Sequence, residues 1–299
     1  MSEATFEAAA AAASPDPRGI ALRRVVGHVG LMTGAALLAA IVILSLAAPL
    51  IAPHDPYAQD LAKRLAPPIW DARGDWSHPL GTDNLGRDYL SRVLWGGRIS
   101  LLIGFSVMII SGLIGSTLGL VAGYFGGRID LVVTFIVTAR LALPVVLVAL
   151  AVVAVASGSL PVVILVLGLL KWDRFAVVMR SAAQQVRHLD YVTAARAAGA
   201  STARIILREV LPNVVPQLIV VATVEAASAI LLEAALSFLG LGVQPPLPSW
   251  GLMISEAKAY MFFSFWMIAI PGTALALLVL AINLVGDGLR DTLAPDGRA

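Results

Sequence analysis

Long apolar stretches alternate with shorter polar segments along most of the chain. About 20 consecutive apolar residues allow an α-helix to cross the hydrocarbon core of a bilayer. Runs of about this length predict six spans, near residues 29–52, 99–123, 130–153, 158–179, 214–236 and 262–286. The fourth is the weakest, because Lys171, Asp173 and Arg174 interrupt it. The pattern therefore predicts an all-α, polytopic membrane helix bundle.

The composition supports a membrane protein over a water-soluble one. Of the 299 residues, 59% are hydrophobic and 13% are charged, whereas a soluble globular chain carries about 25% charged residues. A soluble protein with an unusually apolar core does not account for the apolar runs, because core helices rarely need stretches so long. We therefore expect most of this chain to be surrounded by membrane lipid.

Several kinds of chemistry find no support in the sequence. Cysteine is absent, which excludes disulfides and thiolate sites. No GxxxxGK[ST] phosphate loop is present, so the chain does not bind ATP in that mode. The net charge of +2 gives no indication of a nucleic-acid partner. We expect no cofactor, no catalytic residue and no metal on this chain, since no ligand pair at helical spacing occurs among His28, His54, His78 and His188.

The spans divide the chain into five predicted parts. These are a disordered cytoplasmic tail (1–27), a first transmembrane helix (28–52), an outer loop (53–98), a transmembrane core (99–287) that includes an inner loop (180–212), and a cytoplasmic tail (288–299). The first residues carry two Glu and no basic segment, which does not fit a signal peptide.

The distribution of Lys and Arg predicts that both termini are cytoplasmic. With the N-terminus inside, the inner segments carry thirteen Lys and Arg residues and the outer segments seven, while Arg140 lies within a span. Inner loops of membrane proteins are enriched in these residues. The bias is modest, because the outer loop 53–98 holds six of the seven outer residues.

The inner loop 180–212 reads as two short helices joined by a turn at Gly199–Ser201. Small residues form a flat strip on it, made of Ala194, Ala195, Ala198 and Gly199, which lets another surface approach closely. Arginines surround the strip at Arg187, Arg196, Arg204 and Arg208. Two interpretations remain open on this pattern alone: a docking surface for another protein, and an amphipathic hairpin that lies on the bilayer.

The segment DYVTAARAAGAS followed by REVLPN resembles the EAA loop of ABC-importer permeases. Ala194, Ala195 and Gly199, then Leu211 and Pro212, occupy the places that the family pattern gives to these residue types. Thr193 stands where the family has Glu, and Glu209 stands where it has an apolar residue. The resemblance implies coupling helices that sit in a groove of a cytoplasmic ATPase, formed by Asp190, Tyr191, Thr193, Ala194, Ala195, Gly199, Ala200, Leu211 and Pro212.

Two further segments look like permeases of dipeptide, oligopeptide and nickel importers, specifically the shorter, six-span subunit of the pair. They are HPLGTDNLGRDYLSRVLWGGRISL (78–101) and LSFLGLGVQPPLPSWG (236–251), and the resemblance extends from about residue 20 to the end. The chain departs from these permeases at Phe135, Thr138 and Val177, where Arg, Asp and Arg are usual.

The resemblance implies a non-catalytic subunit of an ATP-driven importer in the bacterial inner membrane. Its expected partners are a sister permease, two cytoplasmic ATPase subunits that bind ATP and Mg, and a periplasmic or lipid-anchored substrate-binding protein. The expected cargo is di- or oligopeptides or related small solutes such as nickel complexes. Transport would proceed by alternating access of the two permeases.

The outer residues suggest a gate or a contact with the binding protein. We assign to it Gly81, Thr82, Asp83, Gly86, Arg87, Asp88, Pro245, Pro246, Trp250 and Gly251. GTDNLGRD does not match the calcium-loop spacing, so we interpret it as a capped turn before a helix. The cations Arg87, Arg92 and Arg98 would either meet an acidic patch on the binding protein or anchor the helix at headgroups.

Three charged residues lie inside predicted spans: Arg140, Glu225 and Glu233. Such residues usually mark a transport pathway or an internal pair. For Glu233, contact with cargo and pairing with an Arg of the sister chain are both open. Arg140 is either the partner of a glutamate or part of the cavity lining.

Two other classes of protein compete with this interpretation. A secondary transporter would use Glu225 and Arg140 as ion sites and would contain unwound half-helices near the midplane, but it gives the EAA-like loop no role. A membrane enzyme would need a Ser/His or Asp/His pair within the spans, and spans two to six contain no His.

Overall fold

The computed structural model describes residues 27–156 and 158–293. The chain begins with α3 (Val29–Leu46), α4 (Ala48–Ile51), the 3₁₀ turn η1 (Leu61–Lys63) and α5 (Tyr89–Phe125). The middle contains α6 (Gly127–Leu141), α7 (Val145–Ala156), α8 (Leu160–Leu170), α9 (Asp173–Val186), α10 (Asp190–Ala197) and α11 (Thr202–Ile205). The π-helical turn η2 (Ile206–Val210), α12 (Leu211–Phe238), α13 (Trp250–Ala257), the 3₁₀ turn η3 (Lys258–Tyr260) and α14 (Trp266–Leu293) follow.

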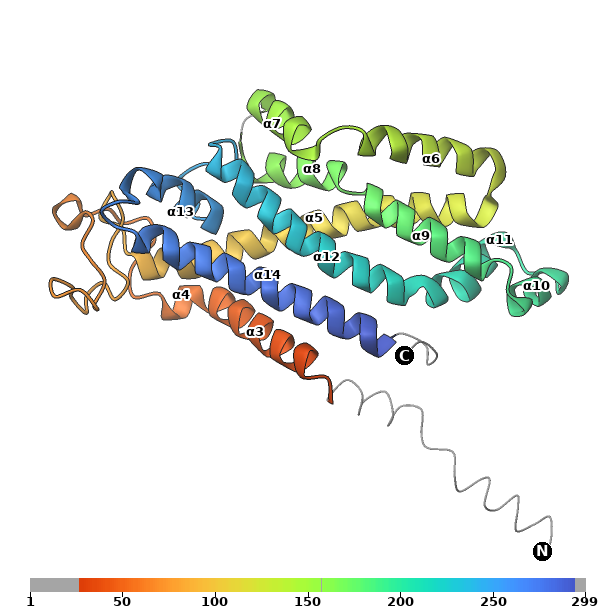
Figure 1. Ribbon diagram of the computed structural model, residues 1–299, viewed down its shortest axis with the longest axis horizontal. Helices are drawn as coiled ribbons and strands as arrows, with labels where there is room; N and C mark the ends of the chain where they lie inside the picture. The colour runs from red at the N-terminus through yellow and green to blue at the C-terminus, as the bar shows by residue number, and fades with distance from the viewer. Residues whose placement is uncertain (1–26, 157, 294–299) are drawn as a thin grey trace, which may run out of the picture.

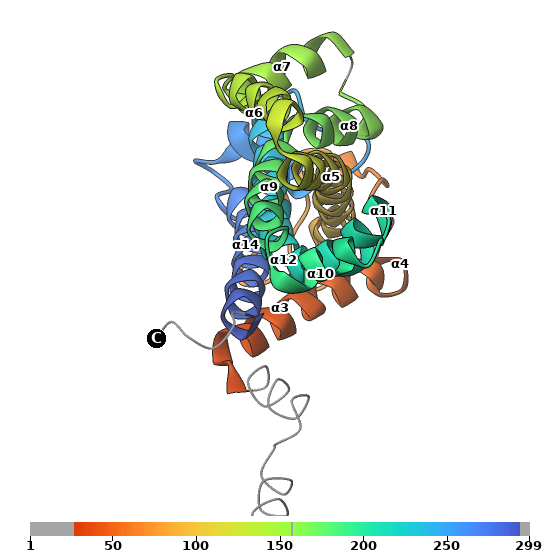
Figure 2. The same ribbon diagram turned by 90° about the vertical axis from the view of Figure 1, so that its right-hand side faces the viewer.

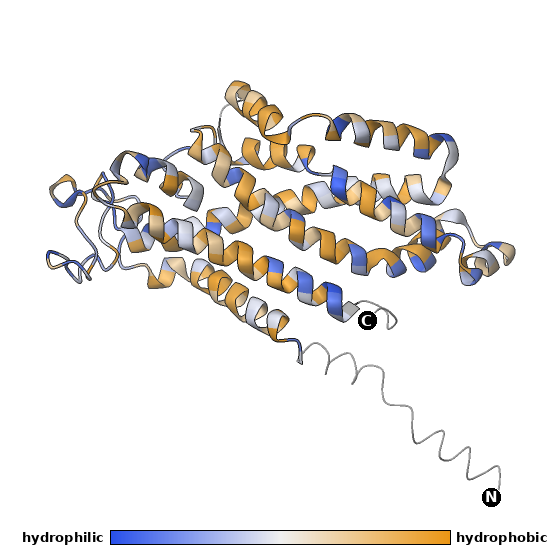
Figure 3. Cartoon of the chain, viewed as in Figure 1, coloured by the Kyte–Doolittle hydropathy of each residue, from blue (hydrophilic) through white to orange (hydrophobic). Residues whose placement is uncertain are grey.

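The long helices run side by side along one direction, which confirms an all-α bundle (Figure 1). The segment before α5 lies at one end of the bundle, and α10 and α11 lie at the other. Viewed from that second end, α6 and α7 stand at one edge of the bundle and α3 at the opposite edge (Figure 2). The helices are mainly apolar along their lengths, and polar residues gather toward the two ends (Figure 3).

Four helical stretches are long and apolar enough to cross a membrane. They are α3, α5, the continuous stretch Thr202–Phe238 and Trp266–Thr292 of α14. The predicted third span is instead the pair α6 and α7, which meet at an 80° bend and make a fifth span if counted as one. The described residues therefore give four or five spans by length and composition, against the six predicted.

The third and fourth predicted spans are each interrupted, and each interruption has a local cause. Pro144 disfavours helical backbone at the residue before it, and α6 accordingly ends at Leu141. The predicted fourth span is divided at Lys171 and Trp172 into the 11-residue α8 and the more polar α9. Apolar runs in sequence do not distinguish such breaks from continuous helices.

The outer loop also ends earlier than predicted. Asp88 caps α5 by accepting a hydrogen bond from the Ser91 amide at 2.8 Å, so the helix begins at Tyr89 and the loop covers 53–88 instead of 53–98. The 37 residues of α5 extend about 55 Å at 1.5 Å per residue, beyond a hydrocarbon core of about 30 Å. Its ends therefore reach the polar ends of the bundle. Most of the predicted tails, 1–26 and 294–299, lies outside the described residues.

Small residues let α5 and α9 pack closely. Gly115, Gly119 and Gly123 recur every four residues on one side of α5 and meet the backbone around α9. A Cβ atom at Gly119 would lie 2.4 Å from the carbonyl oxygen of Ala176. Close backbone approach through small residues at this spacing is a common way to pack helices in membranes. It fixes α9, and with it the hairpin that follows.

Candidate functional site

The helical hairpin at the inner-loop end has the secondary structure that the sequence predicts. Helices α10 and α11 are joined at residues 198–201, where Gly199 adopts a φ of +78° and Ser201 caps α11. The hairpin is shorter than 180–212, because 180–186 belong to α9 and the stretch from Thr202 runs without interruption into α12. Pro212 is the second residue of α12 and directly follows the π-helical turn η2 and Leu211.

One face of the hairpin is fixed and the other is open. Val192 is fully buried and packs in one cluster with Ile205 and Val210. Ala194, Ala198 and Gly199 are exposed on the other side, whereas Ala195 is half-buried and packs against the cluster around Val192. A Cβ at Gly199 would meet no atom within 4 Å. The predicted strip of small residues is therefore an exposed, firmly supported surface.

The remaining predicted coupling residues border this surface. Asp190, Tyr191 and Thr193 are exposed on α10, and Ala200 is half-buried in the turn. Partial burial, with the Glu209 carboxylate as a second cause, raises the pKa of the Tyr191 phenol. On α12, Leu211 packs against the cluster around Val192, and Pro212 is exposed.

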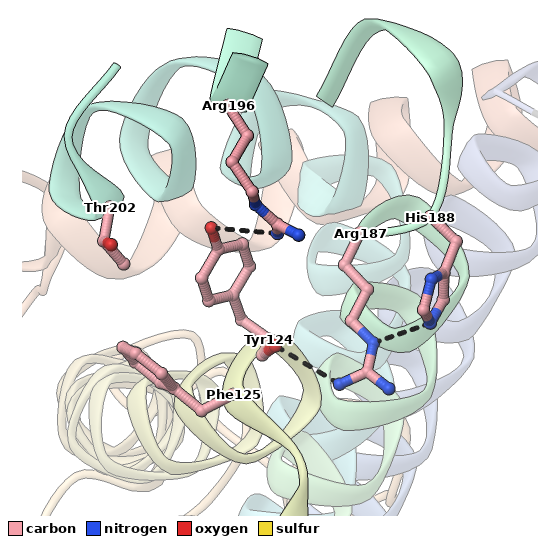
Figure 4. A pocket seen from close by; sticks show the side chains of 6 residues that line it. All are labelled: Tyr124, Phe125, Arg187, His188, Arg196 and Thr202. Carbon is pink, nitrogen blue, oxygen red and sulfur yellow. Dashed lines mark hydrogen bonds between the residues drawn. The ribbon is translucent and has the colours of Figure 1, made fainter. Parts of the chain in front are cut away.

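Two of the predicted surrounding arginines attach the hairpin to the end of α5 (Figure 4). Arg187 donates from Nη1 to the carbonyl oxygens of Gly123 at 3.0 Å and Tyr124 at 3.2 Å, and from Nε to His188 at 2.9 Å. Arg196 donates to the Tyr124 hydroxyl at 3.4 Å. The carbonyls at a helix C-terminus lack helical partners and attract cations. These contacts border a cavity of about 380 Å³ lined by Tyr124, Phe125, Arg187, His188, Arg196 and Thr202.

Charged residues form a buried ion cluster at the end of the bundle that carries the segment 53–88, which we call the outer end after the predicted topology. The Asp83 carboxylate lies 2.6 Å from Arg87 Nε and 2.5 Å from Arg92 Nη1. Glu256, which comes from α13, lies 2.8 Å from Arg92 and 3.3 Å from Arg87. The side chains of Asp83, Arg87 and Arg92 are at most 4% exposed. The expectation that Arg87 and Arg92 meet a binding protein or headgroups is therefore wrong, while Arg98 stacks over the Trp95 ring at 4.7 Å.

The GTDNLGRD segment is the capped turn that the sequence predicts. Asp83 accepts hydrogen bonds from the amides of Leu85 at 2.8 Å and Arg87 at 3.0 Å, and Gly86 has a φ of +73°. Gly81 and Thr82 are buried beside it. The residues of this segment that we assigned to the gate or binding-protein contact are therefore buried below the surface and are not part of it.

The structure also brings together three residues whose proximity their spacing in the sequence does not predict. His54, His78 and Asp88 present ligand atoms within 4.8 Å of one another, an arrangement that could hold a metal ion. His78 Nδ1 lies 3.0 Å from Asp88, and Lys63 Nζ lies 3.5 Å from the other ring nitrogen, so the hydrogen bonds of His78 are satisfied. The three residues converge only through the loop fold, which no local spacing reveals.

Two of the assigned residues after α12, Trp250 and Gly251, pack against other helices of the bundle. Trp250, which we assigned to the gate or the binding-protein contact, is buried, donates from Nε1 to the Val93 carbonyl at 2.9 Å and packs on Gly96. Gly251 touches α12, where a Cβ would lie 2.7 Å from Ala234. Pro245 and Pro246 are exposed in the connection between α12 and α13, and they are the assigned outer residues most accessible at the surface.

The charged residues inside the spans have partners within the chain. Glu225 lies 2.7 Å from Lys171 and 3.2 Å from Arg174. Arg140 pairs with neither glutamate among the described residues; it donates to the carbonyl oxygens of Leu143 at 3.3 Å and of Leu170.

Glu233 has no cation beside it among the residues that the structure describes. It is 1% exposed and accepts hydrogen bonds from Ser237 at 2.7 Å and Ser249 at 3.1 Å. Ser249 caps α13, so this carboxyl group connects α12 to α13. The geometry supports a structural role for Glu233 within this chain.

Family models match two parts of the chain. Residues 115–298 match the family described as binding-protein-dependent transport system inner membrane component. Residues 17–68 match the N-terminal TM domain of oligopeptide transport permease C. The first match alone covers more than half of the chain.

Relatives and a solved structure agree with these matches. The chain is 44% identical to the di/tripeptide transport system permease protein DppC of Pseudomonas aeruginosa (strain UCBPP-PA14), over 89% of this chain and 88% of that protein. It is 42% identical to the dipeptide transport system permease protein DppC of Escherichia coli (strain K12), over 89% of each. An inward-facing MetNI methionine ABC transporter shares the fold, with a TM-score of 0.56 at 19% identity over 68% of this chain and 97% of that one. This chain therefore belongs to the inner membrane components of binding-protein-dependent transport systems, the permeases of ABC importers.

Proposed function

We propose that this permease carries di- or oligopeptides inward by alternating access, driven by ATPase subunits that dock on the hairpin of α10 and α11. The observation that carries the proposal is the exposed strip of small residues on that hairpin, which is supported from behind by Val192. Membership of the family implies an ATPase partner and a second permease. The peptide cargo rests on the relatives, which are named dipeptide permeases at 42–44% identity.

The packing suggests how ATPase movement would reach the membrane helices. Helix α9 leads into the hairpin and packs on the glycines of α5, while α11 continues into α12. A displacement of the hairpin would therefore move α9 and α12 together. Closure of two ATPase subunits on ATP would rock these helices against the sister permease and open the outer end to a loaded binding protein, and hydrolysis would reset the inward-facing state.

The proposal assigns the two ends of the bundle to opposite sides of the bacterial inner membrane. The hairpin end would be cytoplasmic, and the segment 53–88 would be periplasmic and face a periplasmic or lipid-anchored binding protein. His28 lies 3.2 Å from Asp291, so the start of α3 and the end of α14 lie together, on the side of the bundle away from the segment 53–88 (Figure 1), which supports cytoplasmic termini. ATP and Mg would be bound by the partner ATPases and not by this chain, which would have no catalytic role of its own.

The docking surface is tested by adding bulk to it. Ala194→Trp should abolish co-purification of the ATPase subunits from solubilised membranes, while the sister permease remains bound. Ala72→Trp is the matched control, because Ala72 is also an exposed alanine but lies at the outer end. Equal ATPase recovery with both variants would show that the ATPases dock elsewhere.

A further inference from the structure

A cavity lies where two interruptions of helical structure, one between α6 and α7 and one between α8 and α9, face α12. The cavity has a volume of about 290 Å³. It lies at the bend between α6 and α7, at the junction of α8 and α9, and against the middle of α12. We call it the mid-membrane pocket, and its polar lining consists of Arg140, Lys171, Asp173, Arg174, Glu225 and Ser228.

The pocket lies far from both ends of the helices. Glu225 is 23 residues after Thr202, where the continuous helical stretch into α12 begins, and 13 before Phe238, where it ends, which places it about 35 Å from one end and about 20 Å from the other at 1.5 Å per residue. Lys171 likewise lies away from both ends of the stretch 160–186 that α8 and α9 form. Charges at this depth are costly to place and usually serve a pathway or an internal pair.

The internal pairing is incomplete. Lys171 satisfies one oxygen of Glu225 at 2.7 Å and also donates to Ser228 at 2.8 Å. The other oxygen, Oε1, lies 3.2 Å from Arg174 but accepts no hydrogen bond, although the Glu225 side chain is only 1% exposed. Glu225 thus keeps an acceptor directed at the pocket.

Cations exceed carboxylates around the same space. Arg140, Lys171 and Arg174 face the two carboxylates of Asp173 and Glu225. The Arg174 side chain is 62% exposed, which at this depth is tolerated beside water or protein and not beside lipid tails. Arg140 keeps its Nε buried without a hydrogen-bond partner. The pocket therefore holds one cation more than it has carboxylates, together with the Oε1 atom of Glu225 that accepts no hydrogen bond.

We propose that the mid-membrane pocket receives the charged termini of a short peptide in transit. The peptide carboxylate would bind Arg174 and Arg140, and its α-ammonium group would bind Glu225. Arginine suits a carboxylate, because its planar donors match the two oxygens. A zwitterion is favoured over a free cation, which the three cations would repel, and over a neutral solute, which would leave the donors unpaired. This inference rests on the proposed peptide cargo.

The test uses Arg174, because its side chain is largely exposed and its loss leaves the Lys171–Glu225 pair intact. The probe is a radiolabelled dipeptide with benzoylphenylalanine at its second position, compared with its C-terminal amide. It is photolysed with the purified complex of this chain, its sister permease and the ATPases. We expect label in 141–145 or 170–174, and roughly tenfold more label from the acid than from the amide, as one charge-assisted hydrogen bond implies.

Substitutions of Arg174 test whether its guanidinium group binds the carboxylate of the peptide. Arg174→Gln should lower labelling by the acid about tenfold to the level of the amide, and Arg174→Lys should restore part of it. Arg73→Gln is the control, because Arg73 is an exposed arginine of the outer loop. Label elsewhere, or equal acid labelling in Arg174→Gln and Arg73→Gln, would overturn the inference.

Uptake by proteoliposomes that also contain the binding protein separates the two proposals. If the wild-type complex takes up dipeptide with ATP but the pocket is not labelled, only the role of the pocket fails. If the wild-type complex takes up no dipeptide at all, the proposed cargo fails as well.

Discussion

At the scale of single residues, charge is stabilised inside this chain by partners that lie far away in the sequence. Arg92 and Glu256 are 164 residues apart, and Lys171 and Glu225 are separated by a complete hairpin. The sequence identified Arg140, Glu225 and Glu233 as unusual, because charge within an apolar run is visible locally. It could not pair them, since pairing depends on how the helices pack.

The buried cluster at the outer end gives a stability prediction. Arg92→Leu should destabilise the chain by about 3–5 kcal/mol, because Asp83 and Glu256 are then left with one cation between them. Thermal unfolding of the purified chain in detergent would show this as a lowered Tm.

The double variant Arg92→Leu with Glu256→Leu serves as the control, because it leaves the neutral Asp83–Arg87 pair. It should recover much of the lost stability. An unchanged Tm for Arg92→Leu alone would mean that the cluster contributes little to the fold.

At the scale of elements, the sequence predicted turns correctly where a glycine or a capping side chain favours a particular backbone conformation. Gly199 and Ser201 marked the hairpin turn, and Asp88 with Gly86 marked the turn before α5, although the helix starts ten residues earlier than its apolar run. The bend at 142–144 was missed, because it occurs within a segment that is apolar enough to be read as one helix. The break at 171–172 falls where Lys171, Asp173 and Arg174 interrupt the fourth predicted span, which was nevertheless predicted as one helix. Those breaks build the mid-membrane pocket.

Half-helices near mid-depth were expected of a secondary transporter, and two broken elements do occur here. Broken elements alone therefore do not separate the two classes of transporter. The family match over residues 115–298 assigns this chain to the ABC importers.

The close contact of α5 with α9 gives a prediction for an element. Gly119→Ala should destabilise the chain by about 1–3 kcal/mol, as overpacking generally does, because the added methyl group would overlap the Ala176 carbonyl. Gly272→Ala in α14 is the matched control, since a Cβ there meets nothing within 4 Å and alanine favours helix.

The two glycine variants are compared by Tm in the same detergent. Gly272→Ala should unfold at the wild-type temperature or above it. If Gly119→Ala is equally stable, the helices α5 and α9 do not require this close approach.

At the scale of the whole molecule, the bundle has two different ends and apolar residues exposed along its sides. The hairpin and the segment 53–88 lie at opposite ends of the helices (Figure 1), as the proposed coupling to partners on both sides of the membrane requires. Apolar residues on α6 stand open, among them Leu131 at 71% and Phe135 at 70% exposure. This side suits lipid or the sister permease. The apolar runs in the sequence predicted the helix bundle. The proposed docking surface for the ATPase subunits was identified only through the resemblance to the permease family.

The most direct test of the account is ATP-dependent dipeptide uptake by proteoliposomes that contain the complete complex and its binding protein. We predict that labelled dipeptide accumulates only when ATP is present on the hairpin side, that Ala194→Trp abolishes accumulation, and that Ala72→Trp preserves it. Accumulation driven by an ion gradient without ATP, and unaffected by Ala194→Trp, would contradict coupling through the hairpin.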